Sequence, residues 1–344
     1  LIVDEVHERS VDGELLCYLC KKLLEVHPHI RIILMSATIH ISLYQEYFKE
    51  FSGGEYGADG EGEGDPTINC LSVGVKRFPV TVKYLNDLQA MCSAPTNANT
   101  NNGAGAGMSQ NLSYAVKECS KHIVSAYRSG VNSVAPLLKA QCRLTVALIE
   151  EFKARFIGKA VLCFVSGYSD IEEMFDLMTK QWSHAYIGSS GGSGDADGDR
   201  GDGTTPDADT RSAMGSLSHP VFKIIPLYSE LSDEDQELAF KPADASNFEI
   251  KIVIATNIAE SSITLPDVDT VVCLGTHKSM EYSSVSHSAM LVKQWITKDS
   301  ATQRAGRTGR VRPGTVFRLY SEELYKNKCP DHGLSEFHRY IVGV

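Results

Sequence analysis

Short apolar runs alternate along this chain with longer stretches in which apolar residues recur every three to four positions. Short runs of this kind are typical of buried strands, and the periodic stretches are typical of amphipathic helices. Their alternation predicts α/β units built on parallel sheets. Strands are expected at residues 1–3, 30–35, 71–85, 160–165, 223–227, 250–256, 270–274, 291–296 and 315–320. Helices are expected at residues 12–26, 144–156, 170–178 and 233–240.

Individual residues refine these elements. Asp12 is expected to cap the first helix. Pro79, which has no backbone N–H, marks the extended segment 71–85 as an edge strand. Cys17 and Cys20 form a C-x-x-C pair, but no second pair completes a zinc site and both fall in a helical leucine pattern. A core-facing helix is therefore the favoured interpretation, with a metal or redox pair as the alternative.

Three segments are too rich in glycine and small polar residues to pack, and they predict disordered surface insertions. They are residues 52–66, 93–111 and 188–216. The remainder divides into two α/β domains, the second of which gathers the strands from residue 160 onward into one sheet. The expected boundaries are residues 1–92 for the first domain, 112–320 for the second and 321–344 for the start of a C-terminal extension.

The composition is that of an ordinary globular protein, since 42% of the 344 residues are hydrophobic and 22% are charged. No apolar run reaches the roughly 18 residues of a membrane span, so no membrane partner is expected. The cysteines, nine in number and scattered, suit reduced thiols inside the cell. Of the net charge of −10, residues 53–66 carry −5 and residues 188–211 carry −4, which leaves −1 for the rest. Nucleic-acid binding would therefore depend on a local groove.

Polar side chains follow several of the expected strands. Asp4 with Glu5, the triplet 36–38, and Thr256 with Asn257 each stand directly after one. Because ligands bind beyond the carboxyl ends of strands in open α/β sheets, these residues predict a site at that edge. Of two adjacent carboxylates, one can hold Mg²⁺ through water while the other orients and deprotonates an attacking water. A solvated acidic loop is the alternative.

The segment 303–310, Gln-Arg-Ala-Gly-Arg-Thr-Gly-Arg, spaces three arginines three residues apart. On one helix this spacing predicts a shared face. A guanidinium stays protonated in proteins and can bind two phosphate oxygens at once, so the spacing favours phosphate recognition. A basic solvated helix is the alternative.

Four segments together are similar to a known family. In chain order they are Asp4-Glu5-Val6-His7, Ser36-Ala37-Thr38, residues 256–264 and residues 303–310. They resemble motifs II, III, V and VI of the DEAH-box (DEAH/RHA) branch of superfamily 2 RNA helicases, and Glu8-Arg9-Ser10 extends the match. The resemblance implies an α/β fold of two RecA-like parallel-sheet domains. The first would be incomplete, because no P-loop segment G-x-x-x-x-G-K-[ST] is present.

The resemblance assigns roles around motifs II and III. Asp4 is expected to hold Mg²⁺, and Glu5 is expected to activate the attacking water. His7 is expected to link this domain to the second one. Ser36 and Thr38 are expected to couple ATP hydrolysis to RNA.

Further roles come from the second domain. Gln303 is expected to hold the water, while Arg307 and Arg310 are expected to reach the γ-phosphate of ATP. Ser262 is expected to sense the nucleotide state. Phe240 is expected to stack on adenine, with a helix-end core phenylalanine as the alternative.

Contacts to the RNA backbone are implied for Ser166, Gly167, Ser229, Thr256 and Asn257. Backbone contacts fix the register without reading bases, so no sequence preference is expected from them. Two extended runs within residues 278–297 match the position of the strand-separating hairpin of the family, and an ordinary β-hairpin is the simpler alternative.

The implied function is that of an ATP-dependent RNA helicase with ATP, Mg²⁺ and RNA as ligands and an unidentified activating protein as a further partner. An intracellular location, in the nucleus or the cytoplasm, is expected. Without a P-loop, the 344 residues are expected to be an inactive part of such an enzyme. The alternative is a nucleotide-independent RNA-binding or scaffold remnant of a helicase.

Overall fold

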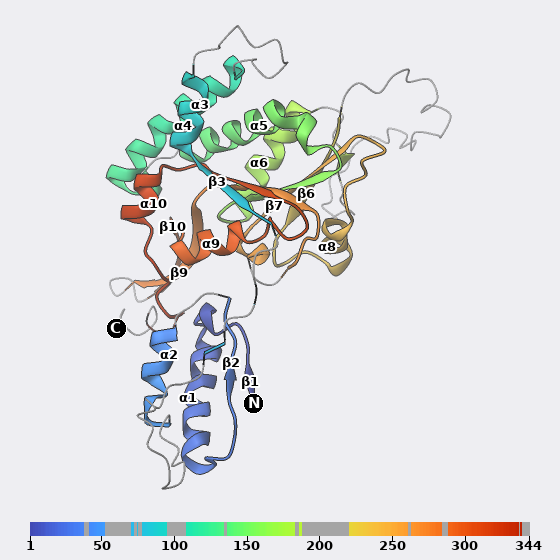
Figure 1. Cartoon of the computed structure of the whole chain (residues 1–344). Helices are drawn as coiled ribbons and strands as arrows, with labels where there is room; N and C mark the ends of the chain where they lie inside the picture. Colours follow the sequence, from blue (N-terminus) through green and yellow to red (C-terminus); the bar gives the residue numbers. More distant parts are fainter. Residues whose placement is uncertain are drawn as a thin grey trace, which may run out of the picture.

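A computed structural model shows a large α/β body and a smaller N-terminal part that meets one edge of it (Figure 1). The structure describes residues 1–37, 41–51, 70–71, 74, 78–94, 108–133, 136–182, 186–187, 220–260, 263–283, 288–336 and 338. Two of the predicted insertions, residues 52–66 and 188–216, lie outside these residues, as does most of the third, 93–111. Among the described helices, none combines the length and the apolar content of a membrane span.

The N-terminal part is a two-stranded parallel sheet with helices packed against it. β1 (Ile2–Val3) pairs with β2 (Ile33–Leu34). The connection between them holds η1 (Val6–Glu8) and α1 (Val11–Val26), and α2 (Ile41–Tyr47) and η2 (Lys49–Phe51) follow. The buried hydrophobic residues of this part are Val3, Val6, Cys17, Cys20 and Phe48.

Helix α1 confirms one expectation and corrects another. Cys17 and Cys20 both face the core, and burial raises the pKa of both thiols, to about 11 for Cys17. The predicted cap at Asp12 was wrong, because Ser10 is the N-cap residue and its Oγ accepts the Gly13 N–H at 3.1 Å. Asp12 lies in the first turn, where its negative charge interacts favourably with the positive end of the helix dipole.

The large body is built on a seven-stranded sheet in which all neighbouring strands are parallel, in the order β3-β11-β8-β4-β7-β6-β5. Its strands are β3 (Val80–Tyr84), β4 (Lys159–Phe164), β5 (Tyr186–Ile187), β6 (Val221–Leu227), β7 (Glu249–Ala255), β8 (Val268–Cys273) and β11 (Gly314–Arg318). The central strands β4, β7 and β8 are buried along nearly their whole length, as strands covered on both faces are.

Helices supply that cover (Figure 1). α3 (Leu85–Ser93), α4 (Gln110–Ser129), α5 (Leu137–Phe156), α6 (Tyr168–Gln181) and α10 (Glu322–Lys328) contribute to the larger buried cluster. The short helix η3 (Val131–Ser133) lies between α4 and α5. A second cluster takes Ala239, Ala259 and Ala305 from α8 (Asp233–Phe240), η4 (Asn257–Ala259) and α9 (Lys298–Ala305). The predicted α/β class with parallel sheets is confirmed.

The predicted boundary of the first domain at residue 92 was wrong. β3 does form an edge strand after Pro79, but it pairs in parallel with β11, from Gly314↔Val80 to Arg318↔Tyr84. β3 and α3 therefore belong to the large body. Local sequence pattern identifies a strand, but it does not show which distant strand will accept its hydrogen bonds.

The expected strand at residues 291–296 was placed in the wrong sheet. It is part of β10 (Ser288–Trp295), which pairs only with β9 (Thr276–Ser283) among the strands that the structure describes. The pair is antiparallel and forms a hairpin beside the main sheet, which confirms the two extended runs predicted within 278–297. Residues 284–287, at its turn, lie outside the described residues.

Gly309 shows why the segment after α9 needs glycine. Its φ of +76° lies in the left-handed region, which L side chains rarely adopt. A Cβ at this position would approach Val80 Cγ2 of β3 to 2.4 Å and the Phe78 carbonyl oxygen to 3.2 Å. The arginine segment can therefore turn tightly against the edge strand only without a side chain here.

We predict that Gly309→Ala lowers the free energy of unfolding by about 3 kcal/mol, from backbone strain and from overpacking against Val80. Urea unfolding followed by circular dichroism measures the loss. The matched test is the same substitution in a Val80→Ala background, where about 1 kcal/mol of the loss should disappear because the Cγ2 atom is gone. Equal losses in both backgrounds would contradict the steric account.

Candidate functional site

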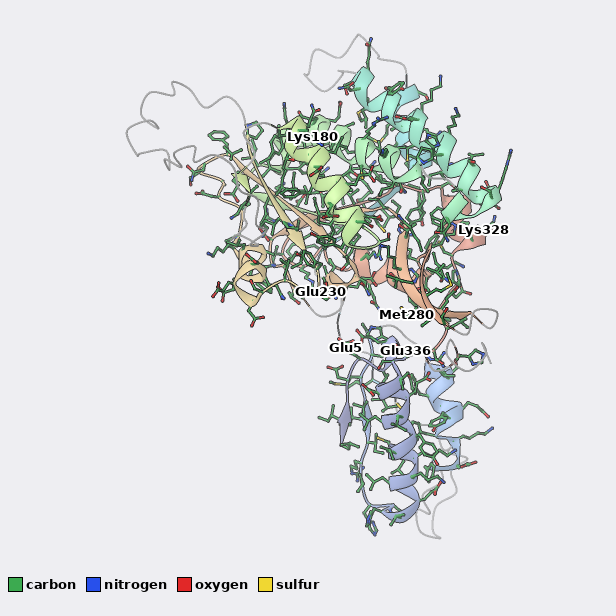
Figure 2. The ribbon with its side chains drawn as sticks, turned by 180° about the vertical axis from the view of Figure 1, so that it is seen from behind. Glu5, Lys180, Glu230, Met280, Lys328 and Glu336 are labelled. Carbon is green, nitrogen blue, oxygen red and sulfur yellow. The ribbon has the colours of Figure 1, made fainter. Side chains whose placement is uncertain are left out.

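The polar loops predicted from the sequence lie beyond the carboxyl ends of parallel strands. Asp4 follows β1, Ser166 lies two residues beyond β4, Ser229 two residues beyond β6, and Thr256 directly after β7. Figure 2 labels Glu5 at the upper end of the N-terminal part and Glu230 at the facing edge of the large body. The two sets of loops therefore meet at the boundary between the two parts of the molecule.

The turn after β1 exposes the acidic pair. The Val6 N–H donates to the Met35 carbonyl oxygen at 3.1 Å, which ties the turn to the end of β2. Glu5 has a left-handed backbone with φ 55°, and its N–H donates to Asp4 Oδ1 at 2.8 Å. A non-glycine residue in this region is strained, and such strain is often kept at functional sites. Both carboxylates are exposed.

His7 connects the acidic turn to the segment after β2. Its side chain is only 5% exposed, and the Ala37 N–H donates to His7 Nδ1 at 3.3 Å. Glu5 Oε2 lies 3.2 Å from the same Nδ1, so the ring stands between the acidic turn and the segment after β2. Nε2 is buried without a hydrogen-bond partner among the described residues.

The three arginines of 303–310 do not share a helix face, so that prediction was wrong. α9 ends at Ala305, and the chain then turns through Gly306 and Gly309. Arg304 points inward and is 0% exposed. Arg307 and Arg310 lie beyond the helix and are half-buried.

Arg304 is held by a buried ion pair. Its Nε donates to Glu260 Oε1 at 2.5 Å, and its guanidinium lies 4.9 Å from the centre of the Phe164 ring. Ser300 Oγ donates to the same carboxylate at 2.9 Å. Burial by itself lowers the pKa of Arg304, but Glu260 and Cys273 together outweigh burial and raise that pKa. Arg304 therefore joins α9 to the loop after β7 and does not reach a ligand.

Arg307 and Arg310 each donate a hydrogen bond to a backbone carbonyl oxygen of the large body. Arg307 Nη1 donates to the Ile263 carbonyl oxygen at 3.0 Å, and Arg310 Nε donates to the Gly306 carbonyl oxygen at 3.4 Å. Burial and the nearby Arg310 lower the pKa of Arg307, while Glu260 and Glu5 raise it in part. The Glu5 carboxylate, from the other part of the molecule, thus contributes to the electrostatic environment of Arg307.

A cleft of about 540 Å³ opens along the same boundary. Five predicted site residues line it, namely His7, Ser229, Thr256, Asn257 and Gln303. The other residues of its lining are Glu8, Ser10, Ile258, Glu260, Thr297, Asp299, Ser300, Gly333 and Glu336. Motifs II, V and VI therefore meet in one largely polar cleft, which their separation in the sequence does not show.

Known proteins are similar to this chain in sequence and in fold. The family model "Helicase conserved C-terminal domain" matches residues 206–312. UM11114 of Mycosarcoma maydis, named as a DEAH-box ATP-dependent helicase, is 29% identical over 98% of this chain and 19% of its own length. DHX29 of Homo sapiens, named as an ATP-dependent RNA helicase, is 30% identical over 95% of this chain and 22% of its own length.

The structure of the E. coli DExH-box NTPase HrpB matches 97% of this chain and 29% of HrpB with a TM-score of 0.58 and 21% identity. This match shows the RecA-like fold. The chain belongs to the DEAH-box helicases of superfamily 2. It spans only about a fifth of the length of UM11114 and DHX29.

Phe240 of this DEAH-box chain is not a core side chain, since it is 39% exposed at the end of α8. The buried Lys251 holds the peptide groups on both sides of it, because Nζ donates to the Ala239 and Lys241 carbonyl oxygens at 3.0 and 2.8 Å. Lys251 also pairs with Asp267 at 2.7 Å. The ring is therefore presented at the surface from a rigid support, although it does not line the cleft.

Two predicted RNA contacts sit differently from the residues in the cleft. Ser166 is buried, and its hydroxyl donates to Asp170, which also accepts from Lys293 of the hairpin at 2.7 Å. Gly167 is half-buried at the start of α6. In this DEAH-box chain the Ser166 hydroxyl is thus used within the protein, and Asp170 links the loop after β4 to the hairpin.

Thr38 and Ser262 lie outside the described residues. Ser36 is described, and it is exposed after β2. Sequence reasoning missed Glu260 and Glu336. Glu260 stands inside the motif V segment, but nothing in its neighbours marks it as the partner of Arg304. Glu336 belongs to no motif, so only the fold shows that it contacts the start of α1.

The acidic turn fits Mg²⁺ only together with a nucleotide. Within the described part of the chain, no group of three or more His, Cys, Asp or Glu side chains is placed to hold a metal. Mg²⁺ in phosphate sites is usually bound by one or two carboxylates, waters and the phosphates themselves. The exposed carboxylate of Asp4 meets this requirement.

We predict that Arg304→Met lowers the free energy of unfolding by about 3–5 kcal/mol, because it leaves the Glu260 carboxylate buried without its cation. Urea unfolding provides the measurement. Arg310→Met is the matched control and should cost less than about 1 kcal/mol, since its guanidinium is partly solvated. Similar losses for the two variants would show that Arg304 is not specially placed.

Proposed function

We propose that this chain is the motif II-to-VI part of an ATP-dependent RNA helicase and that ATP binds where the two parts of the molecule meet. The observation that carries the proposal is the cleft in which His7 and Glu8, which follow Asp4 and Glu5, face Gln303, which leads into Arg307 and Arg310. Across the same boundary Glu5 contributes to raising the pKa of Arg307. Carboxylates on one side and guanidiniums on the other are the groups that phosphoryl transfer requires.

Each residue has a definite task in this proposal. Asp4 holds Mg²⁺ through water, and the ion neutralises phosphate charge. Glu5 orients the attacking water and takes its proton. Arg307 and Arg310 stabilise the negative charge that develops on the transferred phosphoryl group. Gln303, in the adjoining cleft, helps to hold the water.

RNA is proposed to lie along the polar loops of the large body. Ser229, Thr256 and Asn257 line the cleft and offer hydroxyl and amide groups, which bind phosphate and ribose without reading bases. The β9–β10 hairpin stands at the same edge, where Figure 2 labels Met280. In this proposal the loops of the cleft contact both ATP and RNA, so ATP turnover changes the affinity for RNA.

We predict that these 344 residues alone hydrolyse ATP negligibly, because they contain no P-loop to hold the β-phosphate. A chain extended by the P-loop segment of a relative should show RNA-stimulated hydrolysis. In the extended chain, Glu5→Gln should abolish turnover but keep nucleotide binding, and Arg307→Ala or Arg310→Ala should lower kcat at least ~10³-fold. A phosphate-release assay measures turnover.

The buried Arg304 provides the contrast, because its loss should act on stability and not selectively on kcat. Robust ATP hydrolysis by the 344 residues alone would contradict the need for a P-loop. Normal turnover in the Glu5, Arg307 and Arg310 variants would contradict the roles given to them. RNA binding that persists without any ATP turnover in the extended chain would favour a nucleotide-independent RNA-binding protein.

We predict that the double variant Thr256→Ala/Asn257→Ala binds single-stranded RNA about ten-fold more weakly, from the loss of two hydrogen bonds of about 0.7 kcal/mol each. Fluorescence anisotropy should show the same loss for poly(U) and poly(A), since backbone contacts carry no base preference. Thr302→Ala is the matched control, because this exposed hydroxyl donates to Lys298 of its own helix. A loss limited to one sequence would point to base recognition instead.

A further inference from the structure

Residues 330–336, here called the C-terminal tether, run from the large body to the N-terminal part. The tether starts next to Cys329, which is buried in the main core. It continues past Thr297 and the cleft, which Gly333 and Glu336 help to line. Figure 2 labels Glu336 beside Glu5 at the boundary between the two parts.

The first half of the tether is fixed to the start of α9. The Lys298 and Asp299 N–H groups donate to the Pro330 and Asp331 carbonyl oxygens at 2.8 and 3.2 Å. Lys298 Nζ pairs with Asp331 Oδ1 at 2.7 Å, and His332 Nδ1 lies 2.6 Å from Asp299 Oδ2. α9 carries Gln303 and leads into Arg307 and Arg310.

The second half of the tether is fixed to the start of α1. The Glu336 N–H donates to the Arg9 carbonyl oxygen at 3.0 Å, and Glu336 Oε2 accepts the Val11 N–H at 3.0 Å. Ser10 Oγ already caps the Gly13 N–H, so Glu336 supplies the acceptor for a different amide of the same first turn. A carboxylate is favoured there by the free N–H groups and by the helix dipole.

We propose that Glu336 is a positioning residue for the ATP site. By capping α1 from the far end of the chain, it holds the Asp4–Glu5 turn at a fixed place relative to Arg307 and Arg310. α1 begins only a few residues after this turn, so a rotation of α1 would move Glu5 away from the arginines. The inference rests on the proposed function, because it explains how the two halves of that site are kept facing each other.

A geometric experiment tests this directly on the 344-residue chain. Spin labels are placed on exposed positions by Glu25→Cys in α1 and Lys180→Cys in α6, after Cys70→Ser and Cys92→Ser remove the cysteines that are not buried. Pulsed electron–electron double resonance then gives the distribution of distances between the two labels. No nucleotide or RNA is needed, so the result does not depend on ATP turnover.

The expected result is a narrow distribution in the parent chain and one at least twice as wide in Glu336→Ala. Glu336→Gln should remain close to the parent, because its amide oxygen still accepts the Val11 N–H. Glu323→Ala, on an exposed position of α10, is the matched control and should leave the distribution unchanged. An unaltered distribution in Glu336→Ala overturns the proposal.

Hydrogen exchange adds a second readout that separates positioning from general destabilisation. In Glu336→Ala the Val11 amide should exchange about five-fold faster, as expected for the loss of a helix cap. Amides in α4 and α5 should keep their protection, which also shows that the variant is folded. Faster exchange throughout the chain would overturn the proposal. A different combination of results would contradict only the proposed function. In that case the distance distribution widens in Glu336→Ala, but the chain extended by a P-loop segment does not hydrolyse ATP.

Discussion

The buried ion pair of Arg304 and Glu260 is the contact on which the candidate site depends. An arginine in the protein interior is tolerated only when a carboxylate and further acceptors replace its water. Glu260 supplies that carboxylate from the loop that also carries Thr256 and Asn257, while Arg304 stands one residue after Gln303 on α9. The pair therefore joins the two elements that form the wall of the cleft.

The glycines of the segment 303–310 let its three arginines take different positions. A continuous helix would have placed all three guanidiniums on one side, where like charges repel. The chain instead leaves α9 after Ala305 and turns at Gly309, so that Arg304 enters the core and Arg307 and Arg310 remain near the surface. One residue type at equal spacing thus supplies both a buried ion pair and two half-buried cations.

The N-terminal part depends on the body for its orientation. Its own buried cluster is small and centres on Val3, Val6, Cys17, Cys20 and Phe48. Glu336 caps α1 from the far end of the chain, and the cleft between the parts is lined with polar groups that do not form an apolar seal. At such a boundary the hydrogen bonds of the tether, rather than apolar packing, join the two parts.

The sequence by itself determined the α/β class, most strands, the four helices α1, α5, α6 and α8, and the motifs that identify a DEAH-box helicase, because these depend on local periodicity and on residue identity at short spacing. It named His7, Ser229, Thr256, Asn257 and Gln303 as candidate residues, since each follows a strand or lies in a motif, and the fold brings the five into one cleft. Only the tertiary structure decided that β3 joins the second sheet, that β9 and β10 stand apart as a hairpin, and that Arg304 is buried against Glu260. It alone brought Glu336 to α1. These outcomes depend on which distant groups meet after the chain has folded, and no local pattern records the partner of a hydrogen bond or of a buried charge.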